Sequence, residues 1–285
     1  MMSDNDGKVF DSRYDADRVA RFFDAYGQRE WDRLVQNPNH EVSLYIHNHY
    51  LKKYIRRGQR VLEIGAGAGR FTQFLAGLGA QILVADISPG QLALNQRHAE
   101  QDGFSPSVEA WVQMDICDLT QFREGDFDCV VAYGGPFSYV LDRRDRALRE
   151  CMRVLKASGV LLLSVISLWG SAHRRLTGVL ETPDEINRQI TGTGDILPGM
   201  IPGREQYFHM FRAGELHTWL AQANLKVLEM SASDCLSSVW EDKLSEVRAD
   251  AGKWSELLRM ELEACAEQGS LNMGMHIIAV ARKPG

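Results

Sequence analysis

The spacing of apolar residues divides the chain near residue 60. Up to that point apolar positions recur every three or four residues, which predicts two amphipathic helices separated at Asn37-Pro38-Asn39. The positions that carry the pattern are Val19, Phe22, Phe23 and Tyr26 in the first stretch and Val42, Tyr45, Ile46 and His49 in the second. The sequence therefore predicts a helical N-terminal segment over residues 1–57.

From Arg60 onwards, short apolar runs alternate with segments of helical spacing. The runs are 61–64, 81–85, 108–114, 127–132 and 160–167. Because apolar and polar residues largely do not alternate within them, we expect parallel strands that crossover helices bury on both faces. The sequence therefore predicts an α/β fold with a doubly wound sheet.

A polar stretch with several glycines and prolines follows the fifth run and has weak periodicity. Long irregular segments in compact enzymes usually form lids or binding loops, so we expect a lid here. Beyond it the pattern predicts a helix, a strand, one long amphipathic helix and a final strand, at 213–223, 225–230, 239–267 and 275–282. The expected organisation is a helical cap at 1–57 and one domain at 58–285, with its core at 60–168, a lid and substrate segment at 169–210 and a C-terminal part at 211–285.

Composition narrows the possible partners. The chain has 285 residues, 45% of them apolar and 25% charged, which is enough for one large core. Its net charge of −6 repels nucleic-acid phosphates. No apolar stretch approaches the ~20 residues of a bilayer span, and the N-terminus is acidic where a signal peptide would be basic. The five cysteines include no C-x-x-C pair, which predicts free thiols and no metal site. We expect a cytoplasmic protein, monomeric or homodimeric, without nucleic-acid or membrane partners.

The sequence VLEIGAGAGR at 61–70 runs from a predicted strand into closely spaced glycines and then into a helix. Such a turn lets the backbone approach a ligand at the carboxyl edge of the sheet, where doubly wound folds bind nucleotides. Gly65, Gly67 and Gly69 lack the G-x-G-x-x-G spacing of dinucleotide-binding proteins, since Arg70 stands at the third glycine position. Glu63 disfavours a pyrophosphate beside this loop and favours a cationic ligand.

Two more acids lie at the ends of the next two predicted strands. Asp86 follows Gly65 by twenty-one residues, at the position where a carboxylate can accept hydrogen bonds from both ribose hydroxyls. Asp115 follows the third strand, where an acceptor can take the exocyclic amine of adenine. Together with Glu63, these acids favour a nucleoside ligand with a positive charge.

At this point the chain resembles the class I S-adenosylmethionine-dependent methyltransferases in motif content and order. The segments that carry the resemblance are VLEIGAGAGRF (61–71), VADIS (84–88), QMDICDL (113–119), FDCVVAYGG (127–135), RVLKASGVLLLSV (153–165) and, more weakly, 211–230. The resemblance implies a Rossmann-like fold with a seven-stranded, mostly parallel sheet in the order 3-2-1-4-5-7-6, whose last strand is antiparallel.

The resemblance also implies S-adenosyl-L-methionine as the cofactor and assigns residues to it. The methionine part would lie on the glycine loop, the ribose on Asp86, the adenine beside Asp115, and the sulfonium above the strand that follows. The cofactor-binding residues implied in this way are Glu63, Gly65, Ala66, Gly67, Gly69, Asp86, Ile87, Asp115, Ile116, Tyr133 and Gly134.

Methyl transfer is an in-line displacement on an activated carbon, so it needs alignment and exclusion of water more than dedicated catalytic groups. A hydroxyl acceptor also needs a base, usually histidine. The candidate bases are His209, the first choice because it lies among aromatic residues, His173 and His276, with His47 and His49 on the N-terminal helix. The side chains expected around the substrate are Tyr45, His49, Tyr139, Trp169 and Tyr207.

The residues after the fourth strand, YGGPF at 133–137, lack the Asn/Asp-Pro-Pro-Tyr/Phe motif of families that methylate DNA bases or glutamine. With the acidic net charge, this favours transfer to an O, N or C atom of a small metabolite. Two alternatives stay open: an NAD(P)-dependent oxidoreductase and a non-catalytic adenosylmethionine-binding protein.

Overall fold

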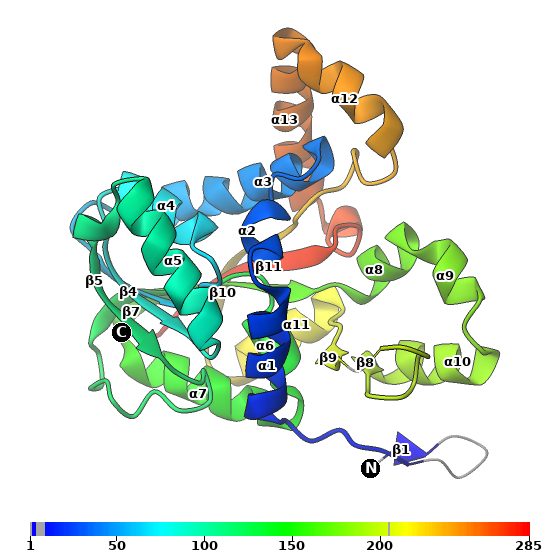
Figure 1. The fold of residues 1–285 in the computed structure, drawn as a ribbon, viewed down its shortest axis with the longest axis horizontal. Helices are drawn as coiled ribbons and strands as arrows, with labels where there is room; N and C mark the ends of the chain where they lie inside the picture. Colours follow the sequence, from blue (N-terminus) through cyan, green and yellow to red (C-terminus); the bar gives the residue numbers. More distant parts are fainter. Residues whose placement is uncertain (1, 4–8, 205) are drawn as a thin grey trace.

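The computed structural model describes residues 2–3, 9–204 and 206–285. A seven-stranded sheet in the order β10-β11-β7-β6-β3-β4-β5 forms its centre (Figure 1). Its strands are β3 (Arg60–Ile64), β4 (Gln81–Asp86), β5 (Val108–Gln113), β6 (Phe127–Ala132), β7 (Leu155–Ile166), β10 (Lys226–Ala232) and β11 (His276–Arg282). The strands from β5 to β7 pair in parallel, whereas β11 is antiparallel to both β7 and β10. Counted from β3, this is the order 3-2-1-4-5-7-6, so the predicted fold class and sheet order are confirmed.

Helices cover both faces of the sheet because successive strand residues point to opposite sides. Val61 packs on one face with apolar residues of α3, α4, α5 and α13, and Leu62 packs on the other with those of α6, α7 and α11. The bounds are α3 (Pro38–Tyr54), α4 (Arg70–Gly77), α5 (Pro89–Gln101), α6 (Pro136–Tyr139), α7 (Arg144–Val154), α11 (Ala213–Gln222) and α13 (Ala251–Ala266). Two apolar faces explain why the strand sequences do not alternate.

Three helices precede the sheet: α1 (Ala16–Tyr26), α2 (Arg29–Asp32) and α3. The predicted break at Asn37-Pro38 is confirmed, because the Asn37 side chain caps α3 by accepting a hydrogen bond from the His40 amide at 2.9 Å. A short pair of strands, β1 (Met2–Ser3) and β2 (Val9–Phe10), lies before α1. The first helix runs along the carboxyl edge of the sheet, over α5 (Figure 1).

The segment expected to be an irregular lid is mostly helical, which corrects that expectation. It contains α8 (Leu168–Arg174), α9 (Leu176–Leu180) and α10 (Asp184–Thr193), followed by a small antiparallel pair, β8 (Asp195–Ile196) with β9 (Phe208–His209). These helices span only one to three turns each, so their apolar spacing is too brief to stand out in the sequence. They extend to one side of the sheet (Figure 1).

The long helix expected at 239–267 is two helices, α12 (Glu241–Ala249) and α13. Asp250 separates them in an extended conformation, and its carboxylate accepts hydrogen bonds from the amides of Gly252 and Lys253. An aspartate at this position starts a new helix because it satisfies amide groups that the helix itself leaves unpaired. The expectation of one helix was therefore wrong at this residue.

All five cysteines are free, as predicted. Within the described residues, no helix is both long and apolar enough to cross a membrane.

Candidate active site

The loop between β3 and α4 depends on glycine for both conformation and space. Gly65 has φ +71°, and a Cβ atom there would lie 2.4 Å from Cγ of Pro136. Gly67 has φ +54°, and its Cβ would lie 3.0 Å from Cγ of Glu30. Any other residue would therefore be strained and would fill the space beneath α2 and α6. The loop is a backbone-lined cradle at the carboxyl edge of the sheet.

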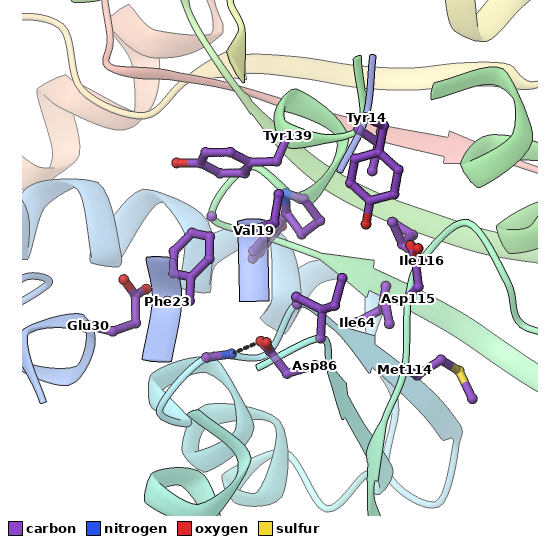
Figure 2. Close-up of a pocket in the computed structure, with 17 residues that line it drawn as sticks. Tyr14, Val19, Phe23, Glu30, Ile64, Asp86, Met114, Asp115, Ile116 and Tyr139 are labelled. Carbon is purple, nitrogen blue, oxygen red and sulfur yellow. Dashed lines mark hydrogen bonds between the residues drawn. The ribbon is translucent and has the colours of Figure 1, made fainter. Parts of the chain in front are cut away.

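Asp86 ends β4 directly beside this cradle. One of its oxygens, Oδ2, accepts a hydrogen bond from the Gly67 amide at 2.8 Å (Figure 2). The other, Oδ1, accepts one from the Ser88 amide at 2.8 Å. Burial raises the pKa of the carboxyl to about 6, although both hydrogen bonds oppose the shift. The carboxylate is thus held rigidly and is available to accept further hydrogen bonds.

A cavity opens between the loop, the ends of β4, β5 and β6, and the first helix (Figure 2). It is a narrow cavity of about 70 Å³ with mainly apolar walls. The sequence-predicted residues on its wall are Gly65, Gly67, Asp86, Ile87, Asp115, Ile116, Tyr133, Gly134 and Tyr139. The structure thus brings together most of the residues to which the resemblance assigns the cofactor.

Three residues assigned to the cofactor, Glu63, Ala66 and Gly69, are not on this wall. Glu63 is 2% exposed beneath the loop, and its Oε2 has no hydrogen-bond partner among the described residues. Burial raises its pKa to about 8, with a hydrogen bond from Thr72 opposing the shift and the charge of Asp86 adding to it. Gly69 begins α4 and lies against the side chain of Asn95.

The N-terminal segment, which the sequence analysis expected to form a helical cap, contributes to the wall of the cavity residues that the sequence did not single out. Residues that it adds to the wall are Tyr14, Val19, Phe23 and Glu30. It is fastened to the start of α5, where the Asp24 carboxylate accepts a hydrogen bond from the Gly90 amide at 2.9 Å. Gln91 also donates to the Phe23 carbonyl at 2.8 Å. The helical spacing of Val19 and Phe23 signalled a buried face, but not that this face covers a ligand site.

The side chains expected around the substrate do not form one group. Of these, Tyr139 alone lines the cavity. Tyr45 and Trp169 are exposed, and His49 packs edge-on against Tyr50. Tyr207 is buried, and its hydroxyl bonds to the backbone of Asp15 instead. The expectation that these side chains surround the substrate together was therefore wrong, because aromatic side chains also pack in cores or lie on the surface.

The three histidines predicted as candidate bases lie in three different parts of the structure. His173 is exposed on α8. His209 lies in a different hollow, between Asp195 and Glu215, with Nδ1 and Nε2 at 2.7 and 2.8 Å from their oxygens. His276, at the start of β11, lines a second cavity that adjoins the first at Gly134. Of the three, His276 is the one that the structure brings near the cavity beside the glycine loop.

We expect His209 to contribute to stability in a pH-dependent way. Burial lowers its pKa, but the hydrogen bonds to Asp195 and Glu215 outweigh burial and raise it above its usual value. A raised pKa in the folded state means that the stabilisation is complete below about pH 6.5 and is lost as the pH rises through the folded-state pKa. His209→Gln should therefore lower Tm more at pH 6 than at pH 9, by roughly 2–4 °C per kcal/mol lost.

Thermal unfolding of both proteins across this range measures the effect. His217→Gln, on the neighbouring helix α11, serves as the control. A difference in Tm that stays constant with pH would contradict the assignment of a charged His209.

The polar groups of the first cavity fit an adenosyl nucleoside. Asp86 offers a fixed carboxylate to the ribose, and the glycine loop leaves space that any Cβ atom would fill. The Tyr133 hydroxyl is buried and has no partner among the described residues. Within the described part of the chain, His, Cys, Asp and Glu side chains form no group of three that could hold a metal ion.

Comparison with known proteins supports the same identity. A family model described as a methyltransferase domain matches residues 62–163, which contain the glycine loop and the ends of β3, β4, β5 and β6. A ubiquinone biosynthesis O-methyltransferase of Xanthomonas campestris is 26% identical over 215 residues, covering 73% of this chain and 80% of that protein.

Solved structures share the fold. The 1,6-didemethyltoxoflavin-N1-methyltransferase of Burkholderia thailandensis, solved with S-adenosylhomocysteine, has a TM-score of 0.55 at 17% identity, covering 95% of this chain and 89% of that one. The cyclase SpnF has a TM-score of 0.59 at 17% identity, covering 97% of this chain and 99% of that one. At such identities these structures show the fold alone, while the family model and the curated relatives are methyltransferases. Residues 62–163 therefore match a methyltransferase domain, and the chain as a whole is similar to S-adenosylmethionine-dependent methyltransferases.

Proposed function

We propose that this enzyme transfers the methyl group of S-adenosylmethionine to a small-molecule acceptor, and that the cavity beside the glycine loop holds the methyl donor. The observation that carries the proposal is the position of Asp86, whose buried carboxylate is fixed by the amides of Gly67 and Ser88 on the wall of the cavity beside the glycine loop. S-adenosylmethionine supplies a methyl carbon already activated by a sulfonium. The protein has to orient that carbon and exclude water.

The chain's own residues provide both requirements. Asp115, held by the Cys117 amide at 2.8 Å, and Ile116 line the part of the cavity at the end of β5 where the adenine is expected. Tyr133 and Gly134 lie at the end of β6, where the resemblance places the sulfonium. The first helix covers the cavity and shields it from solvent. The name of the Xanthomonas relatives, O-methyltransferase, supports an oxygen acceptor.

Asp86→Asn tests the donor site. The amide can accept only one of the two backbone hydrogen bonds and lacks the charge, so we expect affinity for S-adenosylhomocysteine to fall roughly 10- to 150-fold, or about 1.5–3 kcal/mol. Isothermal titration calorimetry measures this directly. Asp102→Asn, at the exposed end of α5, is the matched control.

Calorimetry with NADH is run on the same preparations. Tight binding of NADH without binding of S-adenosylhomocysteine would overturn the proposal, as would wild-type affinity in Asp86→Asn. Binding of S-adenosylhomocysteine alone, weakened by Asp86→Asn, supports it.

A further inference from the structure

A second cavity lies beside the donor cavity, and both are lined by Gly134. It contains about 1080 Å³ of unfilled space including its mouth. Its wall combines apolar and aromatic side chains with arginine and histidine side chains. The arginines and histidines are Arg33, His40, His47, Arg174, Arg175 and His276. Because the two cavities meet at Gly134, a molecule in the second would lie next to the end of β6.

His47 presents a neutral imidazole to this cavity. It projects from α3, and its Nδ1 donates a hydrogen bond to the Ser43 carbonyl at 2.8 Å, which leaves Nε2 unprotonated. The ring packs edge-on against Tyr133 of the donor cavity, with centroids 4.8 Å apart. Among the described residues, Nε2 has no hydrogen-bond partner. The unprotonated Nε2 atom therefore belongs to a ring that packs directly against a residue of the donor cavity, Tyr133.

A second imidazole, His276, lies close to His47. Its backbone pairs with that of Ile166 in the sheet. Its amide also donates a hydrogen bond to the Ser233 hydroxyl at 3.1 Å. The ring centroids of His47 and His276 are 6.1 Å apart. Burial lowers the pKa of both rings, that of His47 to about 4, and nearby Arg33 lowers both further. Both rings are thus neutral at pH 7.

The charged residues give the cavity a positive character. Arg33 pairs with Glu30 at 2.7 Å, and Arg174 pairs with the buried Asp234. Arg175, exposed at the end of α8, has no ion pair among the described residues. Two of the three guanidinium groups on the wall are thus paired with carboxylates, and the guanidinium of Arg175 is available to an anionic ligand. Guanidinium groups bind carboxylates and phosphates in preference to other groups.

Resting on the proposed function, we propose that this second cavity binds the methyl acceptor, that the acceptor is a small, partly apolar hydroxyl compound with an anionic group, and that His47 is its general base. The acceptor oxygen forms a bond to the methyl carbon while the carbon–sulfur bond of the donor breaks, with its electron pair staying on sulfur. The hydroxyl proton moves to Nε2 of His47, from which solvent removes it. The donor thus loses its positive charge, and the acceptor becomes a methyl ether.

The anionic group serves a second purpose. Burial, with a smaller contribution from the charge of Arg33, lowers the pKa of His47 to about 4 and makes it a weak base at neutral pH. A negative charge bound in the same cavity favours the protonated form of a nearby imidazole and so raises the pKa of His47. An amine acceptor lacks this advantage, because its ammonium form is repelled by the same guanidinium groups. Binding of an acid would therefore activate its own base.

Acceptor binding is tested on the full chain saturated with S-adenosylhomocysteine. The probes are 3-hydroxybenzoate, its neutral amide 3-hydroxybenzamide and 3-hydroxyphenyl phosphate, measured by calorimetry. We expect one of the two anions to bind at least about tenfold more tightly than the amide. Arg175→Gln should narrow that gap at least about threefold, whereas Arg149→Gln, exposed on α7, should not. The two anions distinguish a carboxylate from a phosphate.

The base is tested by His47→Asn. The asparagine amide nitrogen can replace Nδ1 as the donor to the Ser43 carbonyl, but no atom replaces Nε2. We expect kcat for the anion that binds to fall about 100-fold or more, with S-adenosylhomocysteine affinity within about twofold of wild type. His49→Asn, on the same helix but outside the cavity, should keep normal turnover.

Two results would overturn the inference: anions that bind no better than the amide, or normal turnover by a folded His47→Asn enzyme. Failure to bind S-adenosylhomocysteine at all would instead overturn the proposed donor site, so the two failures are distinguishable.

Discussion

Gly65→Ala should lower affinity for S-adenosylhomocysteine at least about 100-fold, roughly 3 kcal/mol or more. The added Cβ would lie 2.4 Å from Cγ of Pro136, the first residue of α6, which cannot swing aside as a flexible side chain could. Either the loop or α6 must move, and both line the donor cavity. The backbone at φ +71° adds strain of about 1–2 kcal/mol.

Gly103→Ala is the matched control, because Gly103 has φ +74° but no atom within 4 Å of its Cβ position. Both variants should lose similar stability from backbone strain, whereas only Gly65→Ala should lose the ligand. Calorimetry and thermal unfolding separate the two effects. Equal ligand affinity in the two variants would show that the close approach to Pro136 has no role in binding.

The second large effect concerns Glu63 and pH. Because burial raises the pKa of this carboxyl to about 8 in the folded protein, against 4.5 ordinarily, the folded state binds a proton that the unfolded state has released. The unfolding free energy of the wild type should therefore fall as the pH rises from about 4.5 to 8, by on the order of 4 kcal/mol, and then level off. Glu63→Gln, which is neutral at every pH, should lose most of this dependence and be more stable than the wild type at pH 8.5.

Urea unfolding at pH 5.5, 7 and 8.5 measures the effect, with Glu100→Gln on the exposed side of α5 as control. Asp86 also has a raised pKa, about 6. The unfolding free energy should therefore still fall with pH, with a smaller slope, below pH 6 in Glu63→Gln as well as in Glu100→Gln. Identical slopes for Glu63→Gln and the wild type would rule out a neutral buried Glu63.

The same variant also tests whether Glu63 favours a cationic ligand, as the sequence suggests. The carboxyl does not line the donor cavity, but its Oε2 is without a partner beneath the loop. A cation that reached this oxygen would favour the ionised form, so ligand affinity would rise between pH 6 and 8.5 in the wild type and stay constant in Glu63→Gln.

The local sequence was sufficient to predict the sheet order and the group of residues at its carboxyl edge, and the reason is physical. Parallel strands all end at one edge, so Gly65, Asp86, Asp115 and Tyr133, each placed just after a strand, had to converge. The order of the motifs then implied the sheet order, which the structure has. The predicted elements were wrong where the local signal was weak. At Asp250, one capping side chain divides the predicted helix in two although the helical spacing of apolar residues continues across it.

The acceptor side shows the opposite case. His209 has a histidine's chemistry and aromatic neighbours in the sequence, yet the fold places it between two carboxylates away from the donor cavity. His47 and His276, 229 positions apart in the sequence, lie side by side because α3 packs across the sheet and β11 is antiparallel. No local pattern encodes such a meeting. The sequence by itself determined the fold class, the residues at the strand ends and the motifs whose resemblance implied the donor. Which residues of the first helix line the donor cavity, and how the second cavity is built, were decided by packing between distant segments.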